Sequence, residues 1–310
     1  MIDVLLIIIG IAGLWAATEL VVGGAVAIAS HYGISEFYVG LVVLAIGSDL
    51  PELAVAIDSG IRNLQGIDVS GIVTGASIGS AFGQIGGVMG VAGMVGYLVL
   101  PKKIIFQHGS ILLGSIIILA LTGFDGQVDR VEGLILLTLF LLYLCIILND
   151  RKVFTDNPLK IKTTICRQWV RLACGLVLIY FASKITIDSC ISLSTMLGVH
   201  QSVISVALIG FGTSIPELTI SIGALLKKKS ALSVGNLIGS NIFDTLVPIG
   251  VAALISPITF AREFLVFDLP LLFILTILVL TFFLRKKGLQ RKEAFVLLLF
   301  YVSYLVFKIL

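Results

Sequence analysis

Ten apolar stretches follow one another along this chain, each long enough for an α-helix to cross the hydrocarbon core of a membrane, which takes about 20 residues. With hydrophobic residues at 58% and charged residues at 13%, the chain is no ordinary soluble domain. We therefore expect an all-α polytopic membrane protein of ten transmembrane helices joined by short loops. The expected spans are residues 4–29, 36–61, 69–98, 104–124, 131–149, 168–195, 201–226, 231–256, 264–284 and 293–310.

Lysine and arginine are unevenly distributed over the expected loops. The loops after even-numbered spans hold Arg62, Arg130 and Arg262. The loops after odd-numbered spans hold Lys102, Lys103, Arg151, Lys152, Lys160, Lys162, Arg167, Lys227, Lys228, Lys229, Arg285, Lys286, Lys287, Arg291 and Lys292. By the positive-inside rule the odd-numbered loops are cytoplasmic, so both termini of this cell (plasma) membrane protein are expected to be extracellular. The basic clusters set orientation in the bilayer, and we expect no nucleic-acid partner.

A proline-glutamate motif occurs twice along the chain. Residues 45–53 read AIGSDLPEL in the second span, and residues 209–218 read IGFGTSIPEL in the seventh. A second pair follows in the same order, because residues 75–84, GASIGSAFGQ, align with residues 235–244, GNLIGSNIFD. The two halves of the chain are therefore predicted to be repeats of one structural unit.

The number of spans in each half decides how the repeats are related. Five spans precede a long basic connection and five follow it, so the second half enters the membrane from the opposite side. We predict two inverted repeats, residues 1–149 and 168–310, joined by a cytoplasmic linker over residues 150–167.

The repeated prolines predict breaks in the helices that carry them. Pro51 and Pro216 cannot donate a backbone hydrogen bond and crowd the preceding turn, and each follows a glycine, Gly47 or Gly212. Carbonyls freed inside a membrane persist only where they line a cavity or meet a cation. We expect the second, third, seventh and eighth spans to be broken helices around a central ion site.

Acidic and hydroxyl side chains gather at these breaks. Glu52 and Glu217 directly follow the prolines, in apolar surroundings where a carboxylate is costly. Asp244 and Gln84 lie one helical turn beyond Ser240 and Ser80, so each pair shares a helix face. Ser48, Asp49, Thr213 and Ser214 add oxygens at the same depth. If the inverted halves cross at the bilayer centre, they form an all-oxygen cage suited to hard cations such as Ca²⁺ and Na⁺.

At these residues the chain resembles the cation/calcium antiporter superfamily, and most closely its short prokaryotic sodium/calcium exchangers. The second half matches the motifs G-[TS]-S-x-P-E and G-S-N-x-x-[ND] fully, at residues 212–217 and 239–244. The resemblance implies a calcium position made by Glu52, Glu217, Ser48 and Thr213, with Asp244 and Gln84 at the centre. It implies flanking sodium positions made by Ser214, Ser240 and the Gly210 carbonyl, and by Asp49, Ser80 and the Ala45 carbonyl. It also implies that the first and sixth spans slide as a gate, giving alternating access.

The first half departs from the family pattern at three positions. Asp49 stands where the family has serine, Ala81 replaces the first asparagine, and Gln84 replaces the second asparagine or aspartate. The added carboxylate makes one flanking site more negative. That site could bind Na⁺ more tightly, accept a second divalent ion, or hold a proton, because neighbouring carboxylates oppose each other's ionisation.

The leading hypothesis is a secondary antiporter that exchanges Ca²⁺ for Na⁺ without a cofactor or covalent chemistry. The alternative is an antiporter of Ca²⁺, or another divalent cation, against H⁺, in which Asp49 and its neighbours cycle protons. A channel or a membrane scaffold fits less well, because inverted broken repeats serve alternating access. An enzyme is not expected, since the three histidines form no H-E-x-x-H motif. A monomer is sufficient for transport, and the sequence leaves the oligomeric state open.

Two further patterns predict local contacts. Asp58 and Arg62, and likewise Lys184 and Asp188, are spaced four residues apart and are expected to pair on one helix. Glycines at 71, 75 and 79 form a ridge of small residues that predicts close helix packing.

Overall fold

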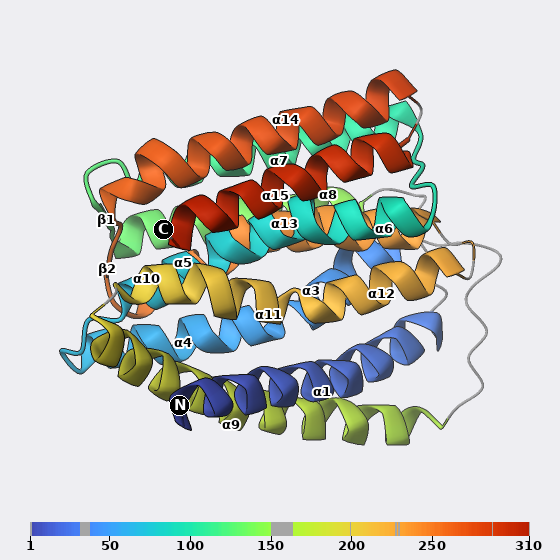
Figure 1. Cartoon of the computed structure of the whole chain (residues 1–310). Helices are drawn as coiled ribbons and strands as arrows, with labels where there is room; N and C mark the ends of the chain where they lie inside the picture. Colours follow the sequence, from blue (N-terminus) through green and yellow to red (C-terminus); the bar gives the residue numbers. More distant parts are fainter. Residues whose placement is uncertain are drawn as a thin grey trace.

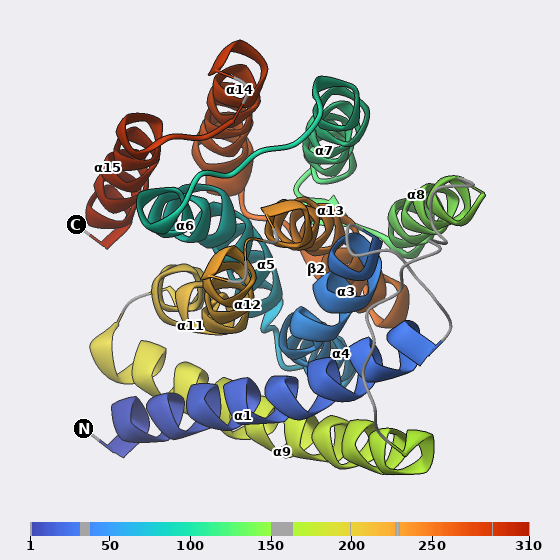
Figure 2. The same cartoon turned by 90° about the vertical axis from the view of Figure 1, so that its right-hand side faces the viewer.

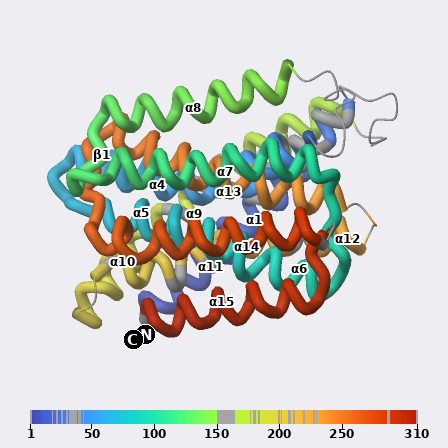
Figure 3. Tube along the Cα trace, turned by 90° about the horizontal axis from the view of Figure 1, so that it is seen from above, coloured from blue at the N-terminus to red at the C-terminus, as the bar shows by residue number. Residues whose placement is uncertain are grey.

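The computed structural model describes residues 2–31, 38–149, 164–198, 200–226, 228, 230–286 and 288–309. Long helices lie side by side in one bundle (Figure 1). Both ends of the chain lie at the same end of the bundle, the end that also carries the short strands β1 (Gln127–Val128) and β2 (Ile258–Thr259) (Figures 1 and 3). These two strands pair antiparallel, with Val128 opposite Ile258.

The helices follow the apolar stretches of the sequence, with η marking π-helical segments. The first half contains α1 (Ile2–His31), η1 (Val39–Leu44), α3 (Ala45–Ser48), α4 (Leu50–Leu64), α5 (Ser70–Phe82), η2 (Gly83–Val88), α6 (Met89–Val95), α7 (Lys102–Thr122) and α8 (Arg130–Leu148). The second half contains α9 (Ile165–Leu197), α10 (Gln201–Ile204), η3 (Ser205–Gly210), α11 (Phe211–Thr213), α12 (Ile215–Leu226), α13 (Ser230–Ile255), η4 (Phe264–Asp268), α14 (Leu269–Lys286) and α15 (Arg291–Ile309).

Within the described part of the chain, five segments are long and apolar enough to cross a membrane. They are Ser70–Val95, Lys102–Thr122, Arg130–Leu148, Ser230–Ile255 and Phe264–Arg285. The helix bounds lie close to those expected, as for the span predicted at 131–149. Most of the predicted linker, residues 150–163, lies outside the described residues, and its last residues belong to α9, which begins at Ile165.

Helices α1 and α9 form a layer of their own along one flank of the bundle (Figure 2). Small residues bring them together, because Gly13 would place a Cβ atom 3.1 Å from the Ala182 Cβ atom, and Gly10 faces Thr186. The helices that the family resemblance assigns to the gate therefore pack mainly against each other. Helices α7, α14 and α15 cover the opposite flank (Figure 2).

Helices α5 and α13 lie at the centre, and every residue of α5 is buried. The predicted glycine ridge is confirmed at two positions. A Cβ atom at Gly75 would lie 2.7 Å from the Ser202 carbonyl oxygen, and one at Gly79 would lie 2.9 Å from Val206. In the aligned motif of α13, Gly239 meets the Leu41 carbonyl of η1 in the same way. Both repeated motifs thus use glycine to bring a central helix against a π-helical segment.

The helix breaks predicted at the prolines are present but short. Asp49 is the one residue between α3 and α4, with φ −89° and ψ 6°, and the Leu53 amide already donates to the Asp49 carbonyl at 3.2 Å. Ser214 separates α11 from α12 in the same way, with Leu218 donating to its carbonyl at 3.1 Å. Each of the two breaks therefore falls on a residue that also carries a side-chain oxygen.

The expected breaks in the third and eighth spans are not found. The third span widens into the π-helical segment η2 between α5 and α6, with helical backbone angles on both sides. The eighth span is one helix, α13, which runs unbroken through its motif and carries Pro248 only beyond it. The prediction was wrong here because neither motif contains a proline, so their backbone hydrogen bonds are not forced open.

A buried ion pair that the sequence did not predict joins α15 to η4. The Lys308 Nζ atom lies 2.8 Å from Asp268 Oδ2 and 2.6 Å from Glu263 Oε1. The Tyr304 hydroxyl donates to Asp268 Oδ1 at 2.7 Å, and its ring stacks on Phe82 of α5 with ring centroids 3.8 Å apart. This cluster couples the outer helix α15 to the central helix.

Candidate ion-binding site

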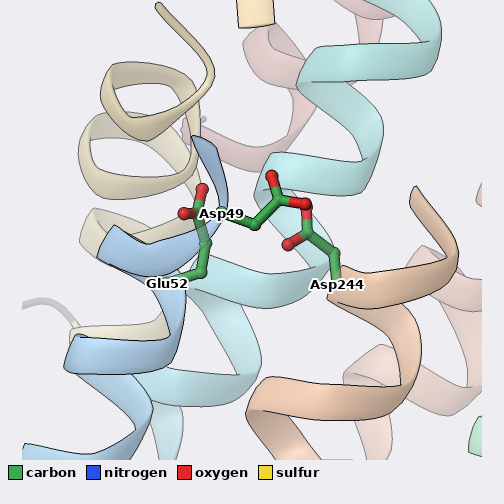
Figure 4. Close-up of side chains that lie close together, drawn as sticks. All are labelled: Asp49, Glu52 and Asp244. Atoms are coloured by element: carbon green, nitrogen blue, oxygen red, sulfur yellow. The ribbon is translucent and has the colours of Figure 1, made fainter. Parts of the chain in front are cut away.

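Three carboxylates converge at the centre of the bundle. Asp49 at the helix break, Glu52 in the first turn of α4 and Asp244 in α13 each offer an oxygen atom, and the three oxygens lie within 4.8 Å of one another. Figure 4 shows the carboxylates of Asp49 and Asp244 pointing toward each other, with Glu52 beside them. All three side chains are buried, at 0–1% exposure, so their charges are not screened by water.

Hydroxyl and amide groups of α5 and η2 bind this acidic cluster from one side. The Ser80 hydroxyl donates to Glu52 Oε1 at 3.0 Å and lies 3.2 Å from the Ser214 hydroxyl. The Gln84 amide nitrogen lies 2.9 Å from Asp244 Oδ2 and 3.4 Å from Asp49 Oδ1, so it donates between two carboxylates. Neutral donors therefore satisfy only part of the acidic cluster.

Several buried oxygens at the centre have no hydrogen-bond partner among the described residues. They are Asp49 Oδ2, Glu52 Oε2, Asp244 Oδ1, Ser240 Oγ and both carboxylate oxygens of Glu217. No lysine or arginine of the described chain forms an ion pair with these carboxylates. Buried polar atoms are almost always paired, so oxygens left open in this number fit a cation. The carboxylates, hydroxyls and amide oxygen form a hard donor set of the kind that Ca²⁺ and Na⁺ prefer.

Glu217, the repeat partner of Glu52, lies outside the group of three carboxylates but faces it. Its side chain is fully buried and interacts electrostatically with Glu52, Asp49 and Asp244. Ser48 lies beside Glu217, and Thr213 lies beside Glu52, so each glutamate meets the hydroxyl of the other repeat. Side chains of both repeats therefore lie together around each glutamate.

The remaining predicted residues, Ser48, Ala45, Gly210, Thr213 and Ser214, are also buried. The Ser48 hydroxyl donates to the Ala45 carbonyl at 3.3 Å, and the Ser214 hydroxyl donates to the Gly210 carbonyl at 2.9 Å. The Ala45 carbonyl also accepts from the Asp49 amide at 3.0 Å, and the Gly210 carbonyl from the Thr213 hydroxyl at 3.4 Å, so each of these carbonyls already accepts two hydrogen bonds. The sequence missed Ser77, whose hydroxyl donates to the Asp244 backbone carbonyl. Its position three residues before Ser80, on the same helix face, could have indicated that it lies near the acidic cluster.

These features define a helical membrane protein that buries an acidic, oxygen-rich cluster between two repeated motifs. A family model described as sodium/calcium exchanger protein matches residues 2–149 and 167–310. The chain therefore belongs to this family of transporters, as the sequence motifs predicted.

Individual relatives are similar to this chain over most of its length. The sodium/calcium exchanger MaX1 of Methanosarcina acetivorans is 24% identical, covering 98% of this chain and 98% of its own. The membrane protein MJ0091 of Methanocaldococcus jannaschii is 29% identical, over 76% of each chain. The solved structure of the sodium-calcium exchanger NCX_Mj, soaked with 10 mM Na⁺ and 10 mM Sr²⁺, is 26% identical. Its TM-score is 0.72, with 98% of this chain and 97% of that chain covered.

Proposed function

We propose that this protein is a secondary active antiporter that exchanges Ca²⁺ for Na⁺ across the plasma membrane by alternating access, with both termini outside the cell. One observation carries the proposal. Buried carboxylates from both repeats, Asp49 and Glu52 from one and Asp244 from the other, converge with oxygens that no described residue satisfies. A buried acidic site of this kind requires cations for its stability and offers only oxygens to hold them.

Competition at the acidic cluster would couple the two ions. In this proposal Glu52 and Glu217 bind Ca²⁺ with Ser48 and Thr213, while Na⁺ occupies the flanking hydroxyls and carbonyls around Asp49 and Ser214. Glu52 and Glu217 also take part of the Na⁺ load, so these carboxylates bind either Ca²⁺ or Na⁺ and one ion displaces the other. A bound ion shifts the balance between inward-facing and outward-facing states only through its different affinity for each.

The layered packing supports alternating access. Helices α1 and α9 pack mainly against each other along one flank, so they can move as a pair over the helices that carry the acidic cluster (Figure 2). In the proposed arrangement the repeats 1–149 and 168–310 are inverted about the site. The match to sodium/calcium exchangers favours Na⁺ over H⁺ as the counter-ion.

The test is ⁴⁵Ca²⁺ uptake into proteoliposomes with an imposed Na⁺, K⁺ or H⁺ gradient. We expect uptake driven by the Na⁺ gradient, and its loss in both Glu52→Gln and Glu217→Gln. Glu132→Gln is the matched control, because Glu132 caps α8 far from the acidic cluster and glutamine can make the same cap. Uptake that persists in both site variants, or that follows the H⁺ gradient alone, would overturn the proposal.

A further inference from the structure

A row of polar side chains runs along one face of α13, leading away from the acidic cluster. Ser233, Asn236 and Ser240 precede Asp244 at spacings of three, four and four residues, which places all four on one side of the helix. Each of these side chains is 0% exposed. The row ends near Ser230, where α13 begins.

The three side chains that precede Asp244 in this row have unsatisfied polar atoms. Among the described residues, Ser233 Oγ, Ser240 Oγ and both the Oδ1 and Nδ2 atoms of Asn236 have no hydrogen-bond partner. Burying an amide without hydrogen-bond partners destabilises a folded protein. Packing alone would favour an apolar residue at Asn236, so the polar row calls for another role.

Helix α12 adds a matching group. Ser221 lies one turn after Glu217, is 0% exposed, and its hydroxyl likewise has no partner among the described residues. Helices α12 and α13 pack against each other, and Figure 2 shows them adjacent at this end of the bundle. We call Ser221, Ser233, Asn236 and Ser240 the α12–α13 polar seam.

The first repeat shows that the fold does not require these polar groups. At the aligned positions it has Ala56 for Ser221, Val73 for Ser233 and Ala76 for Asn236. All three residues are as deeply buried, at 0–2% exposure. The same buried positions are therefore occupied by apolar residues in one repeat and by unpaired polar residues in the other.

We propose that the α12–α13 polar seam is the route by which the cation passes between the acidic cluster and the end of the bundle where α12 ends and α13 begins. This inference rests on the proposed exchange function. Asn236 is the transient ligand midway, offering its amide oxygen to a partly dehydrated Na⁺ or Ca²⁺. A neutral amide binds more weakly than a carboxylate, so the ion can leave again. The seam is closed in this structure, and the charge pattern of the loops predicts that it opens to the cytoplasm.

The first test separates passage from binding by replacing Asn236 with leucine, which has a similar size. We expect Asn236→Leu to lower Na⁺-driven ⁴⁵Ca²⁺ uptake by about tenfold or more, as the loss of a ligand to a charged group implies. Stabilisation of the detergent-solubilised protein by Ca²⁺ against heating should stay as in the unaltered chain. Thr245→Val is the matched control, because Thr245 is a buried polar residue of α13 that instead binds Ser115 of α7.

Wild-type uptake in Asn236→Leu would overturn the route. Loss of Ca²⁺ stabilisation together with uptake would also overturn it, because Asn236 would then belong to the acidic cluster. Absence of Na⁺-driven uptake in the unaltered chain would instead refute the proposed function, and the same assay reports it.

A labelling test addresses the route without relying on transport rates. Ser233→Cys is made in a chain whose Cys145, Cys166, Cys174 and Cys190 are replaced by serine. A membrane-impermeant thiol reagent should modify this cysteine from the cytoplasmic face when both ions are present. Modification from the outer face alone, or from neither face, would contradict the proposed route.

Discussion

The Gln84 amide nitrogen lies 2.9 Å from Asp244 Oδ2, so the repeated motif of one half donates a hydrogen bond to that of the other. Gln84 is a position at which the chain departs from the family pattern of asparagine or aspartate. The same nitrogen lies 3.1 Å from the Ser80 hydroxyl, which itself donates to Glu52. The Gln84 amide therefore holds the Asp244 carboxylate directly and the Glu52 carboxylate through the Ser80 hydroxyl.

Gln84→Leu should destabilise the ion-free protein more than the ion-bound protein. The change removes the donor from a buried carboxylate, which costs about 1.5–3 kcal/mol for a hydrogen bond to a charged group. Bound Ca²⁺ would compensate by neutralising Asp244. Thermal unfolding in detergent, with Ca²⁺ and with a chelator, measures the difference, and Gln107→Leu on the exposed face of α7 is the control. An equal loss in both conditions would contradict this prediction.

Asp49→Ser should change the dependence of transport on Na⁺ while keeping Ca²⁺ uptake. The substitution restores the hydroxyl of the family motif and removes one of the carboxylates that meet in the acidic cluster. Because the cluster becomes less negative, we expect Na⁺ to compete less well, with a roughly tenfold higher Na⁺ concentration needed for half-maximal inhibition of Ca²⁺ binding. Uptake measured over a series of Na⁺ concentrations gives this value. An unchanged Na⁺ dependence would show that Asp49 holds no part of the Na⁺ load.

Arg62→Gln should alter the rate of exchange with little change in stability. Arg62 Nε pairs with Asp58 at 2.6 Å on α4, as predicted, and its Nη1 atom reaches Asp188 of α9 at 2.7 Å. The Asp188 side chain is 55% exposed, so the contact between the two layers contributes about 0–1 kcal/mol. Maximal uptake rates of Arg62→Gln, Asp188→Asn and the double variant form the test. Additive effects in that cycle would mean that the ion pair does not connect the layers functionally.

Lys308→Met should be strongly destabilising, because it leaves Asp268 buried without its cation. Breaking a buried pair in this way costs about 3–5 kcal/mol. Adding Asp268→Leu removes the stranded carboxylate and should recover most of the loss. Melting temperatures of the single and double variants provide the measurement. If the double variant were no more stable than Lys308→Met, the pair would not be the source of the effect.

Sequence patterns within one helix predicted part of the structure, namely the breaks beside the prolines and one ion pair, but not the breaks expected in the third and eighth spans. The breaks beside Pro51 and Pro216 follow from the missing amide hydrogen of proline, and the pairing of Asp58 with Arg62 follows from their spacing of four residues. Contacts between helices were harder to predict from the sequence. The expected pairing of Lys184 with Asp188 gives way to the Arg62 contact from α4, and Lys308 meets Asp268 from 40 residues away. The open polar groups of α13 also escaped notice, because spacing does not show whether a buried amide finds a partner.

Asp49 and Glu52 are made early in the chain, whereas Asp244 follows only after most of it has been synthesised. A ribosome that has completed α8 has therefore delivered two of these acids to the membrane without the third. No fragment that ends before α13 contains all three carboxylates, so under the proposed function ion binding has to wait until α13 is inserted.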